Sequence, residues 1–266
     1  QTAEGGFGMD GLLRARADVI KGILNGADLR QWNPEIDKKI PATYSARNMA
    51  GKATCKEELQ KKMGLEVNPD IPVIGIVTRL VDQKGIAEIF APTYGSIYQI
   101  CTDMKVQFAI LGSGESWCEN EICALQSKLP NLRAYIGYDD ALSHLIEAGS
   151  DFFLMPSKYE PCGLNQIYSM LYGTLPIVRK TGGLADTVDN YNQQTGEGTG
   201  FVFEQLTPRA IYDTVGWAVW AYYNKKDHIK KMQQAGMKKT FGWDEAAEKY
   251  VQVYKEALGR GCGIRQ

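Results

Sequence analysis

The chain has 266 residues, 44% of them hydrophobic and 23% charged, which are ordinary values for a globular protein with a substantial buried core. Its 30 basic and 31 acidic residues leave a formal net charge of −1, so no overall field attracts nucleic acid or an anionic membrane, and any bound anion must be held locally. No apolar run approaches the roughly 20 residues that span a bilayer. The N-terminal stretch QTAEGGFGMDGLLRARAD also lacks the charged-then-apolar layout of a secretory signal.

Helices and strands are expected to alternate along most of the chain. The part up to residue 70 is punctuated by Gly and Pro and reads as irregular connection, apart from a helix over 51–63. Short apolar strands joined by helices then predict right-handed crossovers and a Rossmann-like, doubly wound parallel sheet of the α/β class. The strands are expected at 71–80, 106–112, 132–136, 151–157, 174–180 and 198–203, with helices at 86–98, 117–129, 141–148 and 164–172 and an all-helical C-terminal part.

This pattern divides the chain into three parts. We expect residues 1–50 to form a lead-in and interdomain connection, 51–243 the Rossmann-like domain, and 244–266 a C-terminal helix and tail. In open α/β sheets, ligands bind beyond the carboxyl ends of the strands, where loops meet helix N-termini. The loops that follow the predicted strands are therefore the places to look for a site.

Cysteine and histidine usage argues against a metal centre. Six cysteines are scattered without CxxC pairs or histidines at zinc spacing, and several stand in apolar or helical contexts, which indicates buried free thiols in a reducing compartment. They are Cys55, Cys101, Cys118, Cys123, Cys162 and Cys262. The two histidines, His144 and His228, supply neither a His-based metal site nor a Ser-His-Asp hydrolase site well, so we expect no metal.

The loop after the first predicted strand, TRLVDQKG, carries two cations. Arg79 lies at the strand exit, and Lys84 lies just before the Gly that opens the next helix. The planar fork of Arg and the compact charge of Lys together suit a diphosphate. Two surface cations without a role are the simpler alternative, but their position at a strand exit favours a function.

The loop SKYEPCGLNQ, between a later strand and its helix, is the most informative. Gly163 lets the backbone approach a ligand, and the N–H groups of Leu164 and Asn165, at the positive end of a helix, would receive phosphate oxygens. The Glu160 carboxylate is suited to accept hydrogen bonds from sugar hydroxyls, with Gly163 and Cys162 beside it. For Cys162 a small packing residue is an equally good interpretation.

Three other loops give weaker signals. Gly112 and Gly114 in GSGE are compatible with backbone close to a ribose or base, but they lack the full GxGxxG spacing. Tyr138 either stacks on a purine or packs half-buried on the next helix, and the two Asp residues after it are expected to cap that helix. Thr181 and Gly182 either approach a sugar or phosphate or only form a tight turn.

With these residues in view, the chain resembles the bacterial glycogen synthase and plant starch synthase family of glycosyltransferases. The resemblance rests on GILNGADLRQWNPEIDKKI, PVIGIVTRLVDQKG, YIGYDDALSHLIEAGSDFFLMPSKYEPCGLNQIYSMLYGTLPIVRKTGGLADTV and GTGFVF, in the family's order over most of the chain. It implies the GT-B architecture, in which two Rossmann-like halves face each other across a cleft. This chain looks like the C-terminal, donor-binding half with a short lead-in, and the N-terminal half has no counterpart here.

The resemblance implies a role for each loop residue. Arg79 and Lys84 would neutralise the diphosphate of ADP as it leaves, Tyr138 would stack on adenine, and Glu160 would hold hydroxyls of the donor glucose.

Backbone donors to the phosphate would come from Gly163, Leu164 and Asn165. Asn165 stands where the family usually has Thr or Ser, so an amide replaces a hydroxyl, and the resemblance does not define the role of this side chain.

The implied reaction transfers glucose, with retention, from ADP-glucose to the non-reducing 4-hydroxyl of an α-1,4-glucan, releasing ADP without a cofactor. The expected partners are the nucleotide sugar, the glucan acceptor and the missing N-terminal half, with no nucleic acid or membrane. The chain alone is expected to be inactive, because the acceptor cleft needs both walls. The expected compartment is the cytoplasm of a bacterium or the plastid stroma of a plant or alga.

Two other functions remain open. One is the donor-binding half of a different retaining GT-B transferase, which uses UDP-glucose or makes a small glucoside. The other is a non-catalytic nucleotide-binding or regulatory module. A dehydrogenase is excluded, since no GxGxxG follows the first predicted strand.

Overall fold

The structure, a computed structural model, describes residue 6 and residues 8–261. Contacts group the chain into two compact units, Leu29–Thr240 and a smaller one made of Gln1–Asp28 with Phe241–Gln266. Residues 29–50, expected to be connection, belong to the larger unit because side chains such as Asp37 and Tyr44 are buried in it. The domain bounds at residues 50 and 243 stay predictions.

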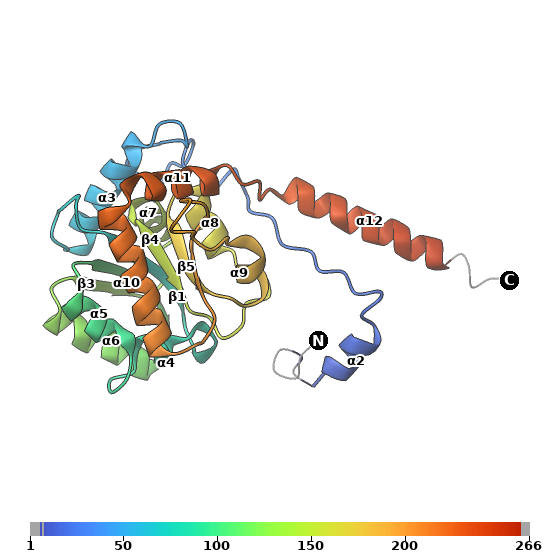
Figure 1. Cartoon of the computed structure of the whole chain (residues 1–266), viewed down its shortest axis with the longest axis horizontal. Helices are drawn as coiled ribbons and strands as arrows, with labels where there is room; N and C mark the ends of the chain where they lie inside the picture. The colour runs from blue at the N-terminus through green and yellow to red at the C-terminus, as the bar shows by residue number, and fades with distance from the viewer. Residues whose placement is uncertain (1–5, 7, 262–266) are drawn as a thin grey trace. The chain divides into compact units, whose positions relative to one another are not determined.

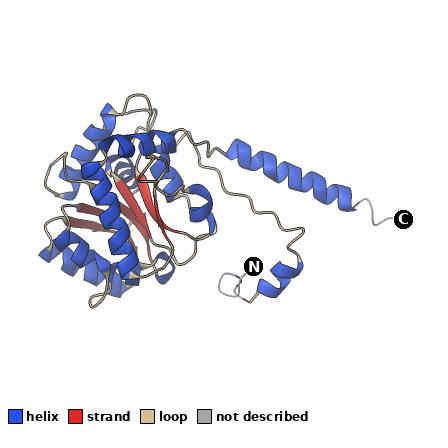
Figure 2. Ribbon diagram, in the orientation of Figure 1, coloured by secondary structure: helices blue, strands red, loops and turns tan. Residues whose placement is uncertain are grey.

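The larger unit is built on a six-stranded, fully parallel sheet with the order β3-β2-β1-β4-β5-β6 (Figures 1 and 2). The strands are β1 Val73–Leu80, β2 Gln107–Gly114, β3 Leu132–Ile136, β4 Phe152–Met155, β5 Leu175–Arg179 and β6 Phe201–Phe203. This confirms the predicted Rossmann-like α/β fold. The chain moves outward from β1 to β3 and then returns to β4 on the other side of β1, so the strand order reverses between β1 and β4.

Helices cover both faces of the sheet. On one face α4 Ile86–Phe90, α5 Ser96–Asp103, α6 Ser116–Lys128 and α10 Pro208–Asn224 contact one another, and on the other lie α3 Ala50–Met63, α7 Asp140–Gly149 and α8 Asn165–Leu171 (Figure 1). The remaining elements of this unit are the short helix η1 Asp82–Lys84, α9 Gly182–Thr187 and α11 Lys226–Met237. Because both faces are covered, neighbouring residues that point to opposite faces are all buried: Val73 and Ile74 of β1 and Phe108 and Ala109 of β2 are 0% exposed.

Three predicted elements are wrong in detail. The helix expected over 86–98 is two helices, α4 and α5, because Pro92 lacks the N–H that would continue the first one. The strand expected at 106–112 continues as β2 through Gly114, which was expected in a loop, and a Cβ on Gly112 would lie 2.1 Å from the carbonyl oxygen of Thr78 on β1. The last strand is shorter than 198–203, since only β6 pairs with β5.

The smaller unit contains α2 Asp10–Ala15 and α12 Trp243–Gly261. A parallel bridge joins Ala27 to Gly242, and Lys21 Nζ lies 3.8 Å from Glu256 Oε2. The helical C-terminal part is confirmed by α10, α11 and α12. None of the helices within the described residues combines the length and apolar character of a membrane span.

Candidate functional site

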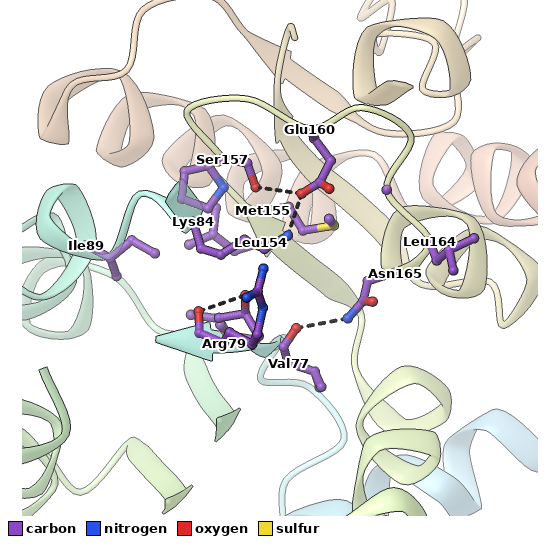
Figure 3. Close-up of a pocket in the computed structure, with 14 residues that line it drawn as sticks. Val77, Arg79, Lys84, Ile89, Leu154, Met155, Ser157, Glu160, Leu164 and Asn165 are labelled. Atoms are coloured by element: carbon purple, nitrogen blue, oxygen red, sulfur yellow. Dashed lines mark hydrogen bonds and ion pairs between the residues drawn. The ribbon is translucent and has the colours of Figure 1, made fainter. Parts of the chain in front are cut away.

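A cavity of about 200 Å³ lies at the carboxyl ends of β1 and β4, where the strand order reverses (Figure 3). The two strands pair only through Ile74 and Gly75 of β1, and beyond that point they leave room between them. The lining residues are Ile76, Val77, Thr78, Arg79, Lys84, Ile89, Leu154, Met155, Pro156, Ser157, Glu160, Gly163, Leu164 and Asn165. Two loops and one helix start, far apart in the sequence, therefore form one site at the position where α/β sheets bind ligands.

An ion pair occupies one side of this cavity. Lys84 Nζ lies 2.5 Å from Glu160 Oε2, and Ser157 donates a hydrogen bond of 3.3 Å to the same carboxylate oxygen. The Lys84 and Glu160 side chains are 18% and 10% exposed, so the pair is largely shielded from water. Sequence reasoning gave Ser157 no role, and its only signal was a polar residue two positions beyond the end of a buried strand.

Arg79 adds a second positive charge. It is exposed at the end of β1, and its guanidinium makes no hydrogen bond or ion pair within the part of the chain that the structure describes. Figure 3 shows this guanidinium directed toward the Lys84–Glu160 pair. Because its donors are unused, Arg79 can bind an anion without first breaking an internal contact.

The start of α8 forms another wall. Gly163 has φ +72, and no side chain caps the first turn of the helix, so its N–H groups lack a side-chain acceptor; Gly163, Leu164 and Asn165 all line the cavity. Asn165 instead uses its side chain for the fold: Nδ2 donates to the carbonyl oxygen of Val77 at 2.9 Å. This bond fastens the beginning of α8 to β1.

Residues predicted near the base lie outside the cavity lining. The Tyr138 ring is 84% exposed, so it is not half-buried against the next helix and remains free for stacking. The predicted helix cap is confirmed, because Asp139 accepts from Leu142 N at 2.8 Å. Gly112 and Gly114 lie beside this loop, and the Gly112 carbonyl accepts from Gly137 N at 2.9 Å.

The turn after β5 supports Glu160 and does not line the cavity. Gly183 N donates to the Glu160 carbonyl at 2.9 Å, and a Cβ on Gly182 would lie 2.1 Å from that same oxygen. Thr181 is the N-cap and Gly182 the first residue of α9, so the start of this helix packs against the Glu160 loop. Cys162 is partly buried and also lies outside the lining.

No disulfide joins the described cysteines. Cys55, Cys101 and Cys118 are buried, and burial raises the pKa of the Cys101 and Cys118 thiols to about 12. Cys262 lies outside the described residues. Within the described part of the chain, no group of three or more His, Cys, Asp or Glu side chains could hold a metal ion.

Comparisons of sequence place this site in a known family. Residues 57–235 match the family model described as "Glycosyl transferases group 1". A glycogen synthase of Treponema denticola is 62% identical over 261 residues, which cover 98% of this chain and 53% of that protein. Soluble starch synthase 1, chloroplastic/amyloplastic, of Oryza sativa subsp. japonica is 42% identical over 97% of this chain and 40% of its own length.

Solved structures agree with this placement. The catalytic domain of Starch Synthase IV from Arabidopsis thaliana, bound to ADP and acarbose, matches with a TM-score of 0.88 and 33% identity, covering 97% of this chain and 53% of that one. Anabaena HepE in complex with UDP and glucose matches with a TM-score of 0.63 at 15% identity, covering 91% and 58%, which shows a shared fold alone. The chain thus spans about half the length of the bacterial glycogen synthases that it matches. It belongs to the group 1 glycosyl transferases and corresponds to the C-terminal half of a glycogen or starch synthase.

Proposed function

We propose that this chain is the donor-binding half of a hexosyltransferase that moves glucose from ADP-glucose to the non-reducing end of an α-1,4-glucan, with retention of configuration. One observation carries the proposal: Arg79, Lys84, Glu160 and the start of α8 line a single cavity at the point where the strand order reverses. Cations and backbone donors on one side of a carboxylate match a ligand that joins a diphosphate to a sugar.

The charges around the cavity fit the departure of ADP. As the glycosidic bond to the phosphate breaks, negative charge grows on the terminal phosphate, and cations already in place stabilise it without reorganisation. Among the described residues the Arg79 guanidinium has no partner, whereas Lys84 pairs with Glu160, so a bound phosphate would replace Glu160 as the anionic partner of Lys84. The Glu160 carboxylate is then available to accept hydrogen bonds from sugar hydroxyls.

ADP is favoured as the nucleotide by the relatives. The plant starch synthase structure bound to ADP and acarbose aligns with nearly the whole chain, whereas the similarity to the UDP-bound protein extends to the fold alone. Tyr138, exposed at the exit of β3, supplies an aromatic face for adenine.

A second half is required for transfer. The chain covers 53% of the Treponema glycogen synthase, and a glucan held between two halves cannot be held by one, so the isolated chain should bind donor but not elongate glucan. The bacterial and chloroplastic relatives support the cytoplasm or the plastid stroma as the compartment.

The proposal is tested by removing each cation from the protein completed with its N-terminal half. Arg79→Ala and Lys84→Ala should each lower kcat by roughly two to three orders of magnitude, since one lost transition-state donor costs about 3–4 kcal/mol. Lys61→Ala, which removes an exposed cation of α3 paired with Glu57, is the matched control and should leave kcat unchanged.

Three results would count against this function. A loss smaller than tenfold in both variants would remove Arg79 and Lys84 from the reaction. Tighter calorimetric binding of UDP-glucose than of ADP-glucose would favour a different GT-B transferase. No transfer by the completed protein, with nucleotide still bound, would favour a non-catalytic module.

A further inference from the structure

Residues at the end of β5 donate hydrogen bonds to two backbone carbonyls of the loop that carries Glu160. The Arg179 guanidinium donates from Nη1 to the Lys158 carbonyl at 2.5 Å, and Gly183 N donates to the Glu160 carbonyl at 2.9 Å. Arg179 Nε also donates to the carbonyl of Glu204, just beyond β6, at 3.1 Å. One guanidinium therefore joins the exits of β4, β5 and β6.

Lys158 extends this connection to the loop that carries Lys84. Its backbone N–H donates to the Gln83 carbonyl at 2.8 Å, and its ammonium lies 2.6 Å from Asp82 Oδ1. Both acceptors belong to η1, the turn that ends at Lys84. Lys158 thus connects the two loops whose side chains form the Lys84–Glu160 ion pair.

We propose that Arg179 is a positioning residue for the donor: without lining the cavity, it fixes Lys158 and thereby holds Lys84 and Glu160 where a terminal phosphate and its sugar bind. This inference rests on the function proposed above. A guanidinium suits the task because its donors leave a rigid plane in fixed directions and reach two carbonyls at once, which one ammonium group on a flexible stem does not do.

Small displacements at such a site have large effects. A misplacement of about 1 Å in a catalytic group can lower a rate on the order of a hundredfold. The Lys84–Glu160 pair faces the far end of the nucleotide, whereas Tyr138 lies on a different strand exit, after β3. Loss of Arg179 should therefore weaken binding of the terminal phosphate and leave binding of the base unchanged.

The experiment compares ADP with AMP, which lacks the terminal phosphate, by calorimetry on the 266-residue chain. The variant is Arg179→Gln, and the matched control is Lys180→Gln. Lys180 is the next residue and 59% exposed, and among the described residues its side chain pairs only with the exposed carboxylate of Glu204, so its loss removes the same charge without a bond to the Glu160 loop. Arg179→Gln should lower the affinity for ADP about tenfold and change the affinity for AMP less than twofold. Lys180→Gln should change neither affinity.

Arg179→Lys keeps the positive charge but loses the planar group that donates in two directions. Its affinity for ADP should lie between those of the parent chain and Arg179→Gln, and its affinity for AMP should stay unchanged. If Arg179→Gln does not unfold in a cooperative thermal transition, Arg179→Lys replaces it as the test variant. Equal effects of Arg179→Gln and Lys180→Gln would overturn the inference, because charge alone would explain them. If Arg179→Gln lowered the affinities for ADP and AMP equally, the inference would also be overturned, because a general loosening of the site would explain the result. Absence of ADP binding by the parent chain would instead overturn the proposed function, and the inference with it.

Discussion

Replacing Glu147 by Gln should remove a pH dependence of stability that originates beneath α8. Glu147 is 1% exposed on α7, and Ser169 of α8 donates to its Oε2 at 2.7 Å. Burial raises the pKa of Glu147 to about 8, against 4.5 for an ordinary glutamate, with smaller opposing effects from the Ser169 hydrogen bond and from the charge of Lys52. At neutral pH this carboxyl is therefore protonated in the folded chain.

The sign and size follow from proton binding. Between pH 4.5 and about 8 the folded chain keeps a proton that the unfolded chain releases, so stability falls as pH rises through this window. At about 1.4 kcal/mol per pH unit, the full shift amounts to roughly 5 kcal/mol, of which roughly 2 kcal/mol is lost between pH 6 and 8. Burial lowers the pKa of Lys52 to about 8. Above pH 8 the unfolded chain therefore keeps a proton on Lys52 that the folded chain releases, and this contribution to stability rises with pH.

The assay is urea unfolding followed by far-UV circular dichroism at several pH values from 5 to 8. Between pH 6 and 8 the free energy of unfolding should fall by about 2 kcal/mol more in the parent chain than in Glu147→Gln. Glu57→Gln is the control, because Glu57 is exposed on α3 and paired with Lys61, and it should follow the parent chain. Identical slopes for the parent chain and Glu147→Gln would refute the reasoning.

Two further substitutions test the packing around the site, both by urea denaturation. Trp32 stacks between the rings of His144 and Tyr168, at centroid distances of 3.8 and 3.9 Å, so Trp32→Ala should lower the free energy of unfolding by about 3 kcal/mol, and an unchanged midpoint would contradict this. Gly85 has φ +70, and a Cβ there would lie 2.1 Å from the Pro156 carbonyl, whereas Gly64 has φ +69 with open space around it. Gly85→Ala should therefore destabilise by at least about 1 kcal/mol more than Gly64→Ala, and equal effects would show that the loop yields freely.

The fold could be predicted from sequence because a covered parallel strand leaves an unmistakable pattern. Phe152, Phe153 and Leu154 of β4 are all at most 2% exposed, and only a strand buried on both faces requires such a run. The helix over 86–98 was predicted wrongly because its apolar spacing continues across Pro92, where backbone chemistry and not hydrophobicity ends α4.

The composition of the site was predictable only where a local pattern exists. Arg79 stands at the end of a buried strand, Lys84 and Glu160 stand in loops that follow buried strands, and a parallel sheet brings these strand ends and loops to one edge. Arg179 acts through its hydrogen bond to the Lys158 carbonyl, 21 residues away, and this partner is set by the packing of one loop on another. No spacing in the sequence encodes such a contact.

Asn165 shows how a structure can separate two roles that the sequence leaves combined. Its Nδ2 donates to the Val77 carbonyl at 2.9 Å, while its backbone N–H lies in the uncapped first turn of α8. Asn165→Thr shortens the side chain and loses the bond, which should cost about 1 kcal/mol in urea denaturation, but it keeps the N–H, so ADP affinity should change less than roughly threefold.

Asn165→Asp places a carboxylate against the Val77 carbonyl and beside the proposed phosphate site, so its charge alone should lower the affinity for ADP at least tenfold. The informative comparison is therefore the Thr variant. If Asn165→Thr kept its stability but lost ADP affinity tenfold, the amide would act on the ligand, and its bond to β1 would be incidental. If stability falls and affinity holds, the side chain serves the fold and the backbone serves the ligand, which is why a hydroxyl and an amide can both stand at this position.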